Sequence, residues 1–207
     1  MKYMPRPYAD VGRTGQKRRT RDALVAAARQ LVASGTSPTV DDAALAAGVA
    51  RSTAYRYFPG QRELLAAAHP ETARTSLLPD VPPEDVAGRL DAVVEEFTRM
   101  IVETEAQQRT MLRLSLEQLG DGPRSLPLRQ GRAIAWISEA LAPLQGQWAG
   151  QDIQRLVLAI RSATGIESLV WLTDVGGLSR EEAVASMRWT AGALLKQALL
   201  DGPPERG

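Results

Sequence analysis

The sequence predicts an all-α protein of about nine helices, with a small three-helix unit at its N-terminal end and a larger helical bundle after it. Apolar residues recur at spacings of three and four along most of the chain, which is the period of a helix with one buried face. No run alternates β-branched with polar residues, as a half-buried strand would. Signals that start and stop helices then divide the chain into its elements.

The first helix is expected over residues 17–34, where five apolar residues share one face and Gly35 follows as a stop signal. Those five residues are Leu24, Ala27, Ala28, Leu31 and Val32. Thr39 then precedes two acids, a capping-box-like arrangement that begins a second helix ending near Ala47. Gly48 marks a tight turn, and a third helix follows over 50–57 until Pro59 and Gly60.

A fourth helix opens at Leu64 and must kink or stop before Pro70, because proline disfavours helix at the residue before it. The run of prolines over 77–84 predicts a linker or corner, so a boundary between two units is expected within residues 62–82. Five further helices complete the chain. They are expected just past Pro83, over 107–119, over 127–145, over 152–173 and over 180–200.

Composition narrows the class of protein. The chain has 207 residues, 44% of them hydrophobic, which is enough to bury a core in one or two domains. It has no cysteine, and its single histidine, His69, lies near no nucleophile motif, so we expect neither an enzyme nor a metal or cofactor site. No apolar run approaches about 18 residues and the N-terminus lacks a signal-peptide pattern, which predicts a cytoplasmic protein without a spanning helix.

Charge is distributed unevenly along the chain. Residues 1–62 hold eleven basic and four acidic residues, a net charge of +7, whereas the remainder holds fourteen basic and twenty acidic residues, a net charge of −6. A basic end on an acidic body is typical of a protein that meets a polyanion at one end. A solvated basic tail without a partner would give the same charge count, so the charge distribution alone does not distinguish the two possibilities.

Residues 39–65 carry the most specific motif. Gly48 suits a tight turn between two helices, Ala44 and Val49 can fill the angle between them, and Phe58 can anchor the second helix in a core. This segment resembles the helix-turn-helix signature of TetR-family transcriptional regulators. The matching residues are Thr39, Val40, Ala44, Ala47, Gly48, Val49, Thr53, Tyr55, Tyr57, Phe58 and Leu64.

The resemblance implies that residues 50–57 form a recognition helix for the DNA major groove. Arg51 and Ser52 are expected to read base edges, while Thr53, Tyr55 and Tyr57 position the helix on the backbone. Packing of either tyrosine inside the three-helix unit is the alternative. The candidate DNA-binding residues are Lys17, Arg18, Arg19, Thr39, Arg51, Ser52, Thr53, Tyr55, Arg56, Tyr57 and Gln61.

Two positions depart from the family pattern. Ala50 replaces the serine that commonly opens the recognition helix, which removes a cap worth about 1 kcal/mol unless another group substitutes. Gln61 replaces a lysine that often touches phosphate, and Arg62 is a neighbour that can compensate.

Three regions are therefore expected. Residues 1–16 form a basic N-terminal arm without regular structure, which either lies in the flanking minor groove or is a floppy tail. Residues 17–62 form the helix-turn-helix DNA-binding domain, and residues 63–207 form a helical domain for ligand binding and dimerisation. Pro70 is then either a hinge between the two domains or a passive break.

The resemblance also implies a small-molecule pocket in the larger domain and a homodimer. The candidate ligand-binding residues are Phe97, Met100, Met111, Arg113, Trp136 and Trp171, for which ordinary core packing is the alternative. Helices over 152–173 and 180–200, the second opened by a Ser179 and Glu182 capping box, form a hairpin that can pair with a second copy. Both helices facing a monomeric core is the alternative.

These observations predict a TetR-like transcriptional regulator. It is expected to be a repressor that binds a palindromic operator as a homodimer and is released by a small molecule, with an activator left open. The alternatives are a helical small-molecule-binding protein or enzyme with a vestigial DNA-binding head, and an adaptor that works through protein contacts.

Overall fold

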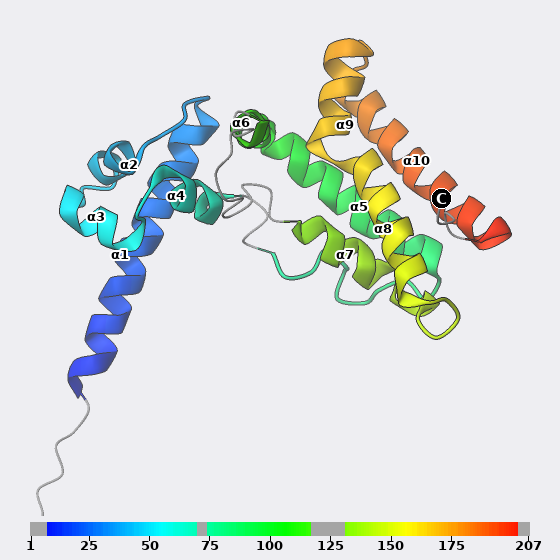
Figure 1. Cartoon of the computed structure of the whole chain (residues 1–207), viewed down its shortest axis with the longest axis horizontal. Coiled ribbons are helices and arrows are strands. Elements are labelled where there is room, and N and C mark those ends of the chain that lie inside the picture. Colours follow the sequence, from blue (N-terminus) through cyan, green and yellow to red (C-terminus); the bar gives the residue numbers. More distant parts are fainter. Residues whose placement is uncertain (1–7, 70–73, 117–130, 203–207) are drawn as a thin grey trace, which may run out of the picture. The chain divides into compact units, whose positions relative to one another are not determined.

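The computed structural model describes residues 8–69, 74–116 and 131–202, and these ranges hold helices joined by loops, without a named strand (Figure 1). The all-α prediction is confirmed. The chain divides into two compact units. We call them the head, with described residues 8–69, and the body, with described residues 74–116 and 131–202. The head thus extends to His69 rather than ending at residue 62.

Four helices form the head, and three of them begin and end close to their expected positions. They are α1 (Tyr8–Ala33), α2 (Val40–Ala46), α3 (Arg51–Tyr57) and α4 (Gln61–Ala68). The α4 helix ends just before His69, as the position of Pro70 predicts. Pro70 itself lies outside the described residues.

The α1 helix is longer than the sequence suggested, because it begins at Tyr8 and not at residue 17. The prediction of an irregular arm over residues 1–16 is therefore wrong for residues 8–16, whereas residues 1–7 lie outside the described ranges. The sequence contains no proline between Pro7 and the end of the helix. Once a helix is nucleated, each further residue adds one hydrogen bond at little cost, so nothing stops α1 before that point.

The core of the head consists of small and aliphatic side chains around one aromatic ring. Phe58 is buried at the end of α3, and Arg29 ties α1 to α4 by donating from Nε to the carbonyl of Ala68 at 3.1 Å. The buried cluster contains Leu24, Val25, Ala28, Val40, Ala43, Ala44, Ala54, Phe58, Leu64 and Ala68.

The body contains the remaining helices. They are α5 (Val86–Glu103), α6 (Glu105–Leu116), α7 (Arg132–Ala140), a 3₁₀ turn η2 (Ala142–Leu144), α8 (Gly150–Thr164), α9 (Ile166–Val170), a π turn η3 (Trp171–Val175) and α10 (Arg180–Asp201). The α7 helix ends before Pro143, which sits in the tighter 3₁₀ turn, as a proline inside a helix requires.

The core of the body is built around two aromatic rings. Phe97 on α5 and Trp136 on α7 meet edge to face, with ring centroids 6.0 Å apart. The indole N–H of Trp136 donates to the carbonyl of Thr75 at 3.2 Å, and Leu77 is buried in the same core. The segment before α5 is therefore fastened to the body and is not a free linker.

The C-terminal helices form an antiparallel hairpin (Figure 1). The expected helix over 152–173 is broken at Gly165, whose backbone is extended. A Cβ at this position would clash with the side chains of Arg161 and Glu167. Those two side chains pair across the break at 3.2 Å. Both capping boxes that the sequence predicts are present, at Ser179 for α10 and at Thr39 for α2.

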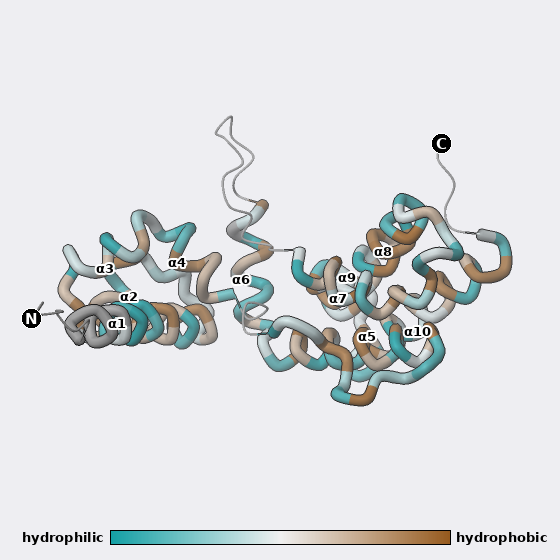
Figure 2. The backbone as a smooth tube through the Cα atoms, turned by 90° about the horizontal axis from the view of Figure 1, so that it is seen from below, coloured by the Kyte–Doolittle hydropathy of each residue, from teal (hydrophilic) through white to brown (hydrophobic). Residues whose placement is uncertain are grey.

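The expectation that no segment is long and apolar enough to cross a membrane is wrong for one helix among the described residues. The segment Gly150–Val175 passes that test by length and composition, with a mean hydropathy of 1.3 over its best window. Figure 2 shows the apolar stretch along α8. Core helices of globular proteins pass the same test, and Leu156, Val157 and Ile160 of α8 are buried in the body.

Candidate nucleic-acid interface

The α2 and α3 helices meet at a tight turn that depends on Gly48. This residue has φ +64°, in the left-handed region where a side chain is strained. The N–H of Val49 donates back to the carbonyl of Ala44 at 2.9 Å, which closes the end of α2. The roles predicted for Gly48, for Ala44 and Val49, and for Phe58 as the anchor are thus confirmed.

The α3 helix turns one face to the core and the other to solvent. Ala54 is fully buried, and Phe58 anchors the helix end, whereas Thr53 and Tyr57 are half-buried at the edges. The exposed face carries Arg51, Ser52, Tyr55 and Arg56. Three hydrogen-bonding side chains and a phenol are therefore presented outward on one short helix. The alternative of a fully packed tyrosine does not apply to Tyr55, which is 38% exposed.

The start of α3 has no side-chain cap, as the alanine at position 50 predicts. The first residue of the helix makes a charged contact with a neighbouring helix instead. Arg51 pairs through Nε with the carboxylate of Asp41 on α2 at 2.9 Å, and its guanidinium lies 5.7 Å from the ring centroid of Tyr55. The sequence does not reveal this partner, because the two residues belong to different helices.

A hollow lies between α1 and α3 beside the exposed face of the recognition helix. Its volume is about 490 Å³, and it receives both a lysine and an arginine. Its lining residues are Gln16, Lys17, Thr20, Thr53, Arg56 and Tyr57. Four of these were predicted from the sequence. Gln16 and Thr20 were missed, although both lie within one turn of Lys17 on the same helix.

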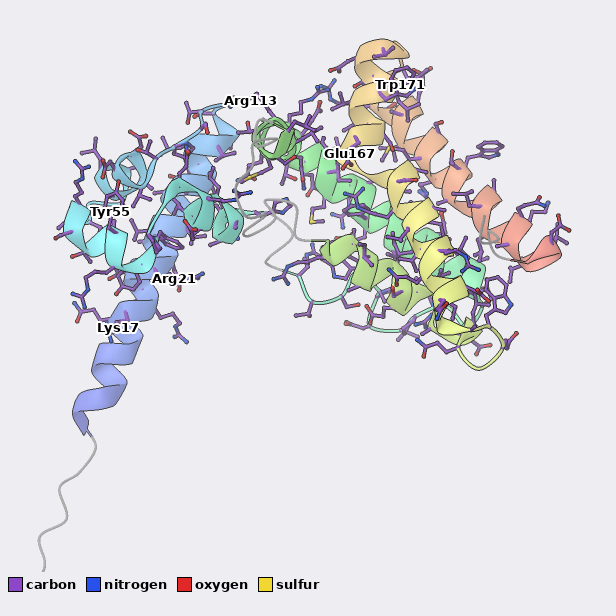
Figure 3. All side chains as sticks on the ribbon, in the orientation of Figure 1. Lys17, Arg21, Tyr55, Arg113, Glu167 and Trp171 are labelled. Atoms are coloured by element: carbon purple, nitrogen blue, oxygen red, sulfur yellow. The ribbon has the colours of Figure 1, made fainter. Side chains whose placement is uncertain are left out.

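The remaining basic residues of α1 differ in which side of the helix they occupy and in what they contact. Figure 3 shows Lys17 on α1 and Tyr55 on α3 within the head. Arg18 and Arg19 are also exposed, but Arg19 is nine residues from the buried Ala28, which is about half a turn around the helix, and so lies opposite the core face. Arg21 stacks over the ring of Phe58 at 5.4 Å, which stabilises the head.

Thr39 and Gln61 hold the loop before α2. The Thr39 hydroxyl donates to the Asp42 carboxylate at 2.7 Å, and the backbone N–H groups of Thr39 and Asp42 complete the capping box. These hydrogen bonds lower the pKa of Asp42. The amide nitrogen of Gln61 donates to the carbonyls of Ser37 and Pro38 at 3.0 and 3.1 Å, so this side chain braces the loop in which Thr39 begins α2.

The residues predicted to line a ligand pocket have different environments in the part of the chain that the structure describes. Phe97, Met111 and Trp136 are buried in the body, and Met100 packs at the margin of the same core. Arg113 and Trp171 are exposed, and Figure 3 shows Trp171 near the tip of the C-terminal hairpin. Trp171 lies two residues, and so about 200°, from the buried Leu169, which is why it points away from the core.

Comparison with known families gives a match that covers the head. Residues 23–68 match the family described as bacterial regulatory proteins, tetR family. Over these residues the chain is similar to TetR-family regulators. A comparison with curated proteins finds no match.

The matched segment contains the outward-facing α3 together with α2, α4 and the C-terminal part of α1. It runs from the first buried residues of α1 to the last residue of α4. The TetR-like head is accordingly a DNA-binding unit of a transcriptional regulator. The body lies outside the matched residues, so its role has to be argued from its own surfaces.

Proposed function

We propose that this TetR-like regulator is a repressor that binds an inverted-repeat operator as a homodimer and leaves it when a small molecule binds. The observation that carries the proposal is the outward face of α3, where Arg51, Ser52, Tyr55 and Arg56 stand exposed on a basic head. An α-helix with such residues fits the major groove, where arginine can bind guanine through two hydrogen bonds.

The pair between Asp41 and Arg51 supports the assignment of Arg51 to base reading. Asp41 engages Nε, which leaves both terminal nitrogens of the guanidinium to form a bidentate contact with a base. An exposed ion pair of this kind contributes about 0–1 kcal/mol to stability, so its main effect is to fix the direction of the side chain. Ser52, the next residue on the same exposed face, is proposed as the second base contact.

The hollow between α1 and α3 is proposed as a phosphate site. Lys17 and Arg56 bring two positive charges to it, and Thr53 and Tyr57 bring hydroxyl groups. Thr39, at the start of α2, and Arg18, on α1, are proposed as further backbone contacts. Gln61 is proposed to act indirectly, by holding the loop that carries Thr39.

The homodimer is supported by apolar side chains that the body leaves exposed on its C-terminal hairpin. Trp189 on α10 is 74% exposed and Leu158 on α8 is 47% exposed. The set comprises Leu158, Trp171, Val175, Trp189, Leu199 and Leu200. We call it the hairpin face. Exposed large apolar side chains along one helical hairpin are typical of a protein interface, and pairing two hairpins gives a four-helix bundle.

Selection of bound sequences from random duplex DNA tests the DNA-binding part. The full chain is expected to enrich an inverted repeat, and Arg51→Ala is expected to lose preference at one position of each half-site, at a cost of about 1–3 kcal/mol. Asp41→Asn should weaken preference at the same position while leaving the head folded. Arg99→Ala, on the surface of the body, is the matched control.

Salt dependence separates phosphate contacts from base contacts. If the dimer neutralises six or more phosphates, affinity should fall by about 10³ or more between 50 and 200 mM salt. Arg56→Ala should weaken binding to every sequence and reduce the slope by about two per dimer, one for each head. Enrichment of no sequence, together with a flat salt response, would favour the vestigial head and contradict the proposal.

A further inference from the structure

A groove runs along the body between α5 and α10, away from the residues predicted to line a pocket. Its volume is about 490 Å³, which is within the usual range for small-molecule sites. Leu90, Val94, Ala191 and Leu195 form its buried and apolar floor. The remaining lining residues are Ala87, Asp91, Arg188, Gly192, Lys196, Leu199 and Leu200.

The charged groups on the rim differ in whether they already have partners. Arg188 makes a bidentate pair with Asp91, at 2.7 to 3.1 Å, and a further contact with Glu95 at 3.1 Å. Its charge is therefore matched. Lys196 is exposed and makes no hydrogen bond or ion pair with any residue that the structure describes. The groove thus combines an apolar floor with one unmatched positive charge.

The groove is elongated along α10. Its lining residues extend from Arg188 to Leu200 on this helix, a length of about 18 Å at 1.5 Å per residue. That length suits an alkyl chain lying along the floor. Gly192 contributes to the opening, because a Cβ built at this position meets no atom within 4 Å.

We propose that this groove binds an amphipathic carboxylate, with the alkyl chain on the floor and the carboxylate against Lys196. Burial of the chain supplies the main gain, about 0.8 kcal/mol per buried CH₂ group, and the ammonium selects an anion. Binding of such a ligand to the groove does not depend on the proposed function. Only the consequence, that this ligand class releases the regulator from DNA, rests on it.

A second copy of the chain is the competing occupant, because Leu199 and Leu200 belong to both the groove and the hairpin face. In the proposed dimer the partner covers the end of the groove at these two leucines, but an apolar partner surface supplies no counter-charge for the ammonium of Lys196. A carboxylate ligand supplies that counter-charge, so charge complementarity favours the ligand.

Titration calorimetry of the full chain with dodecanoate, below its micelle concentration, tests the site. Dodecanoate is expected to bind at least about tenfold more tightly than dodecyltrimethylammonium, and Lys196→Gln should remove most of that preference. Gly192→Leu should abolish binding by filling the groove. The leucine replaces glycine on an exposed side of a helix and improves its helix propensity, so the variant is expected to fold. Arg99→Gln is the control for loss of a surface cation.

Three results would overturn the site: no dodecanoate binding, equal binding of the ammonium compound, or unchanged binding by Gly192→Leu. If Gly192→Leu makes the protein monomeric while the parent binds no dodecanoate, the groove is an interface between copies. DNA release is measured separately on the selected operator. Dodecanoate that binds through Lys196 without altering operator affinity would confirm the site and contradict ligand release.

Discussion

The head and the body expose opposite kinds of surface. The head presents arginine, lysine and hydroxyl groups around α3, and over residues 15–69 only Leu45 and Tyr55 are large apolar side chains with high exposure. The body exposes two tryptophans and several aliphatic side chains on its hairpin face. Under the proposed function the two surfaces serve two partner classes, a polyanion for the head and an apolar surface of a second copy for the body.

The two cores also differ in kind. The head buries mostly alanine and leucine around a single ring, whereas the body buries a phenylalanine and a tryptophan against each other. A small core leaves the head dependent on few contacts. Variants that act on matched positions in the two units can therefore test whether the units are stable independently.

The largest effect is expected from replacing the two phenylalanines, of which each unit contains one. Phe58→Ala should destabilise the head, and Phe97→Ala the body, by about 3–5 kcal/mol each, since both rings are buried. Denaturant unfolding checks the loss of stability. Phe58→Ala should abolish DNA binding while leaving the oligomeric state intact. Loss of the oligomer in this variant would show that the two units are not independent.

A smaller but clear effect is expected on assembly from Trp189→Glu. The indole is 74% exposed on α10, so the fold should persist while a charge disrupts the proposed dimer, weakening it by at least about 2 kcal/mol if Trp189 is a hot spot. Light scattering over a range of protein concentrations measures the shift. Lys17→Glu, on the head, should leave the oligomer unchanged. A Trp189→Glu variant as dimeric as the parent would remove the hairpin face from the proposed interface.

A modest gain is expected from restoring a cap in the head. Ala50 has the extended backbone of an N-cap but no side-chain hydrogen bond, so Ala50→Ser should stabilise the head by about 1 kcal/mol. Ala149→Ser makes the matched change at the uncapped start of α8 in the body. Thermal unfolding of the two variants shows which unit melts first. If Ala50→Ser raises the temperature of the first unfolding transition, the head melts first. If Ala149→Ser raises it, the body melts first.

The smallest effect concerns acid stability of the body. Arg109 donates two hydrogen bonds to Asp174, which together with Thr173 lower the pKa of Asp174 from 3.8 to about 2. A depressed pKa adds stability above the ordinary value, and this is lost as pH falls from about 4 to about 2. Asp174→Asn should therefore flatten the fall of melting temperature in that range. An unchanged acid profile would mean that solvent screens this exposed pair completely.

Much of the fold could be predicted because its signals are local. Thr39 and Ser179 each begin a helix with an acid three residues later, and Gly48 supplies a backbone conformation that few other residues adopt. The anchoring of α3 through Phe58 was predicted as well, and the structure adds Ala54, one turn earlier on the same buried side.

The features that could not be predicted are of two kinds. Some depend on contacts between residues that are distant in the sequence, and others were assigned from residue type without regard to the spacing along the helix. The Asp41–Arg51 pair and the hollow beside Lys17 bring together different helices, which no single periodicity reveals. Trp171 was assigned to a pocket because it is aromatic, although its position opposite Leu169 already indicated the outer face. The break at Gly165 had a visible signal, a glycine inside an apolar helical pattern.

The N-terminal part of α1, from Tyr8 to Ala23, has a consequence for the length of DNA that the protein protects. Sixteen residues, from Tyr8 to Ala23, precede Leu24, the first buried residue among positions 15–69, and as a helix they form a rod of about 24 Å. Laid along a duplex, such a rod covers about seven base-pair steps of 3.4 Å. Nuclease footprints should then extend outward past each half-site, and removal of residues 1–15 should shorten them on both flanks.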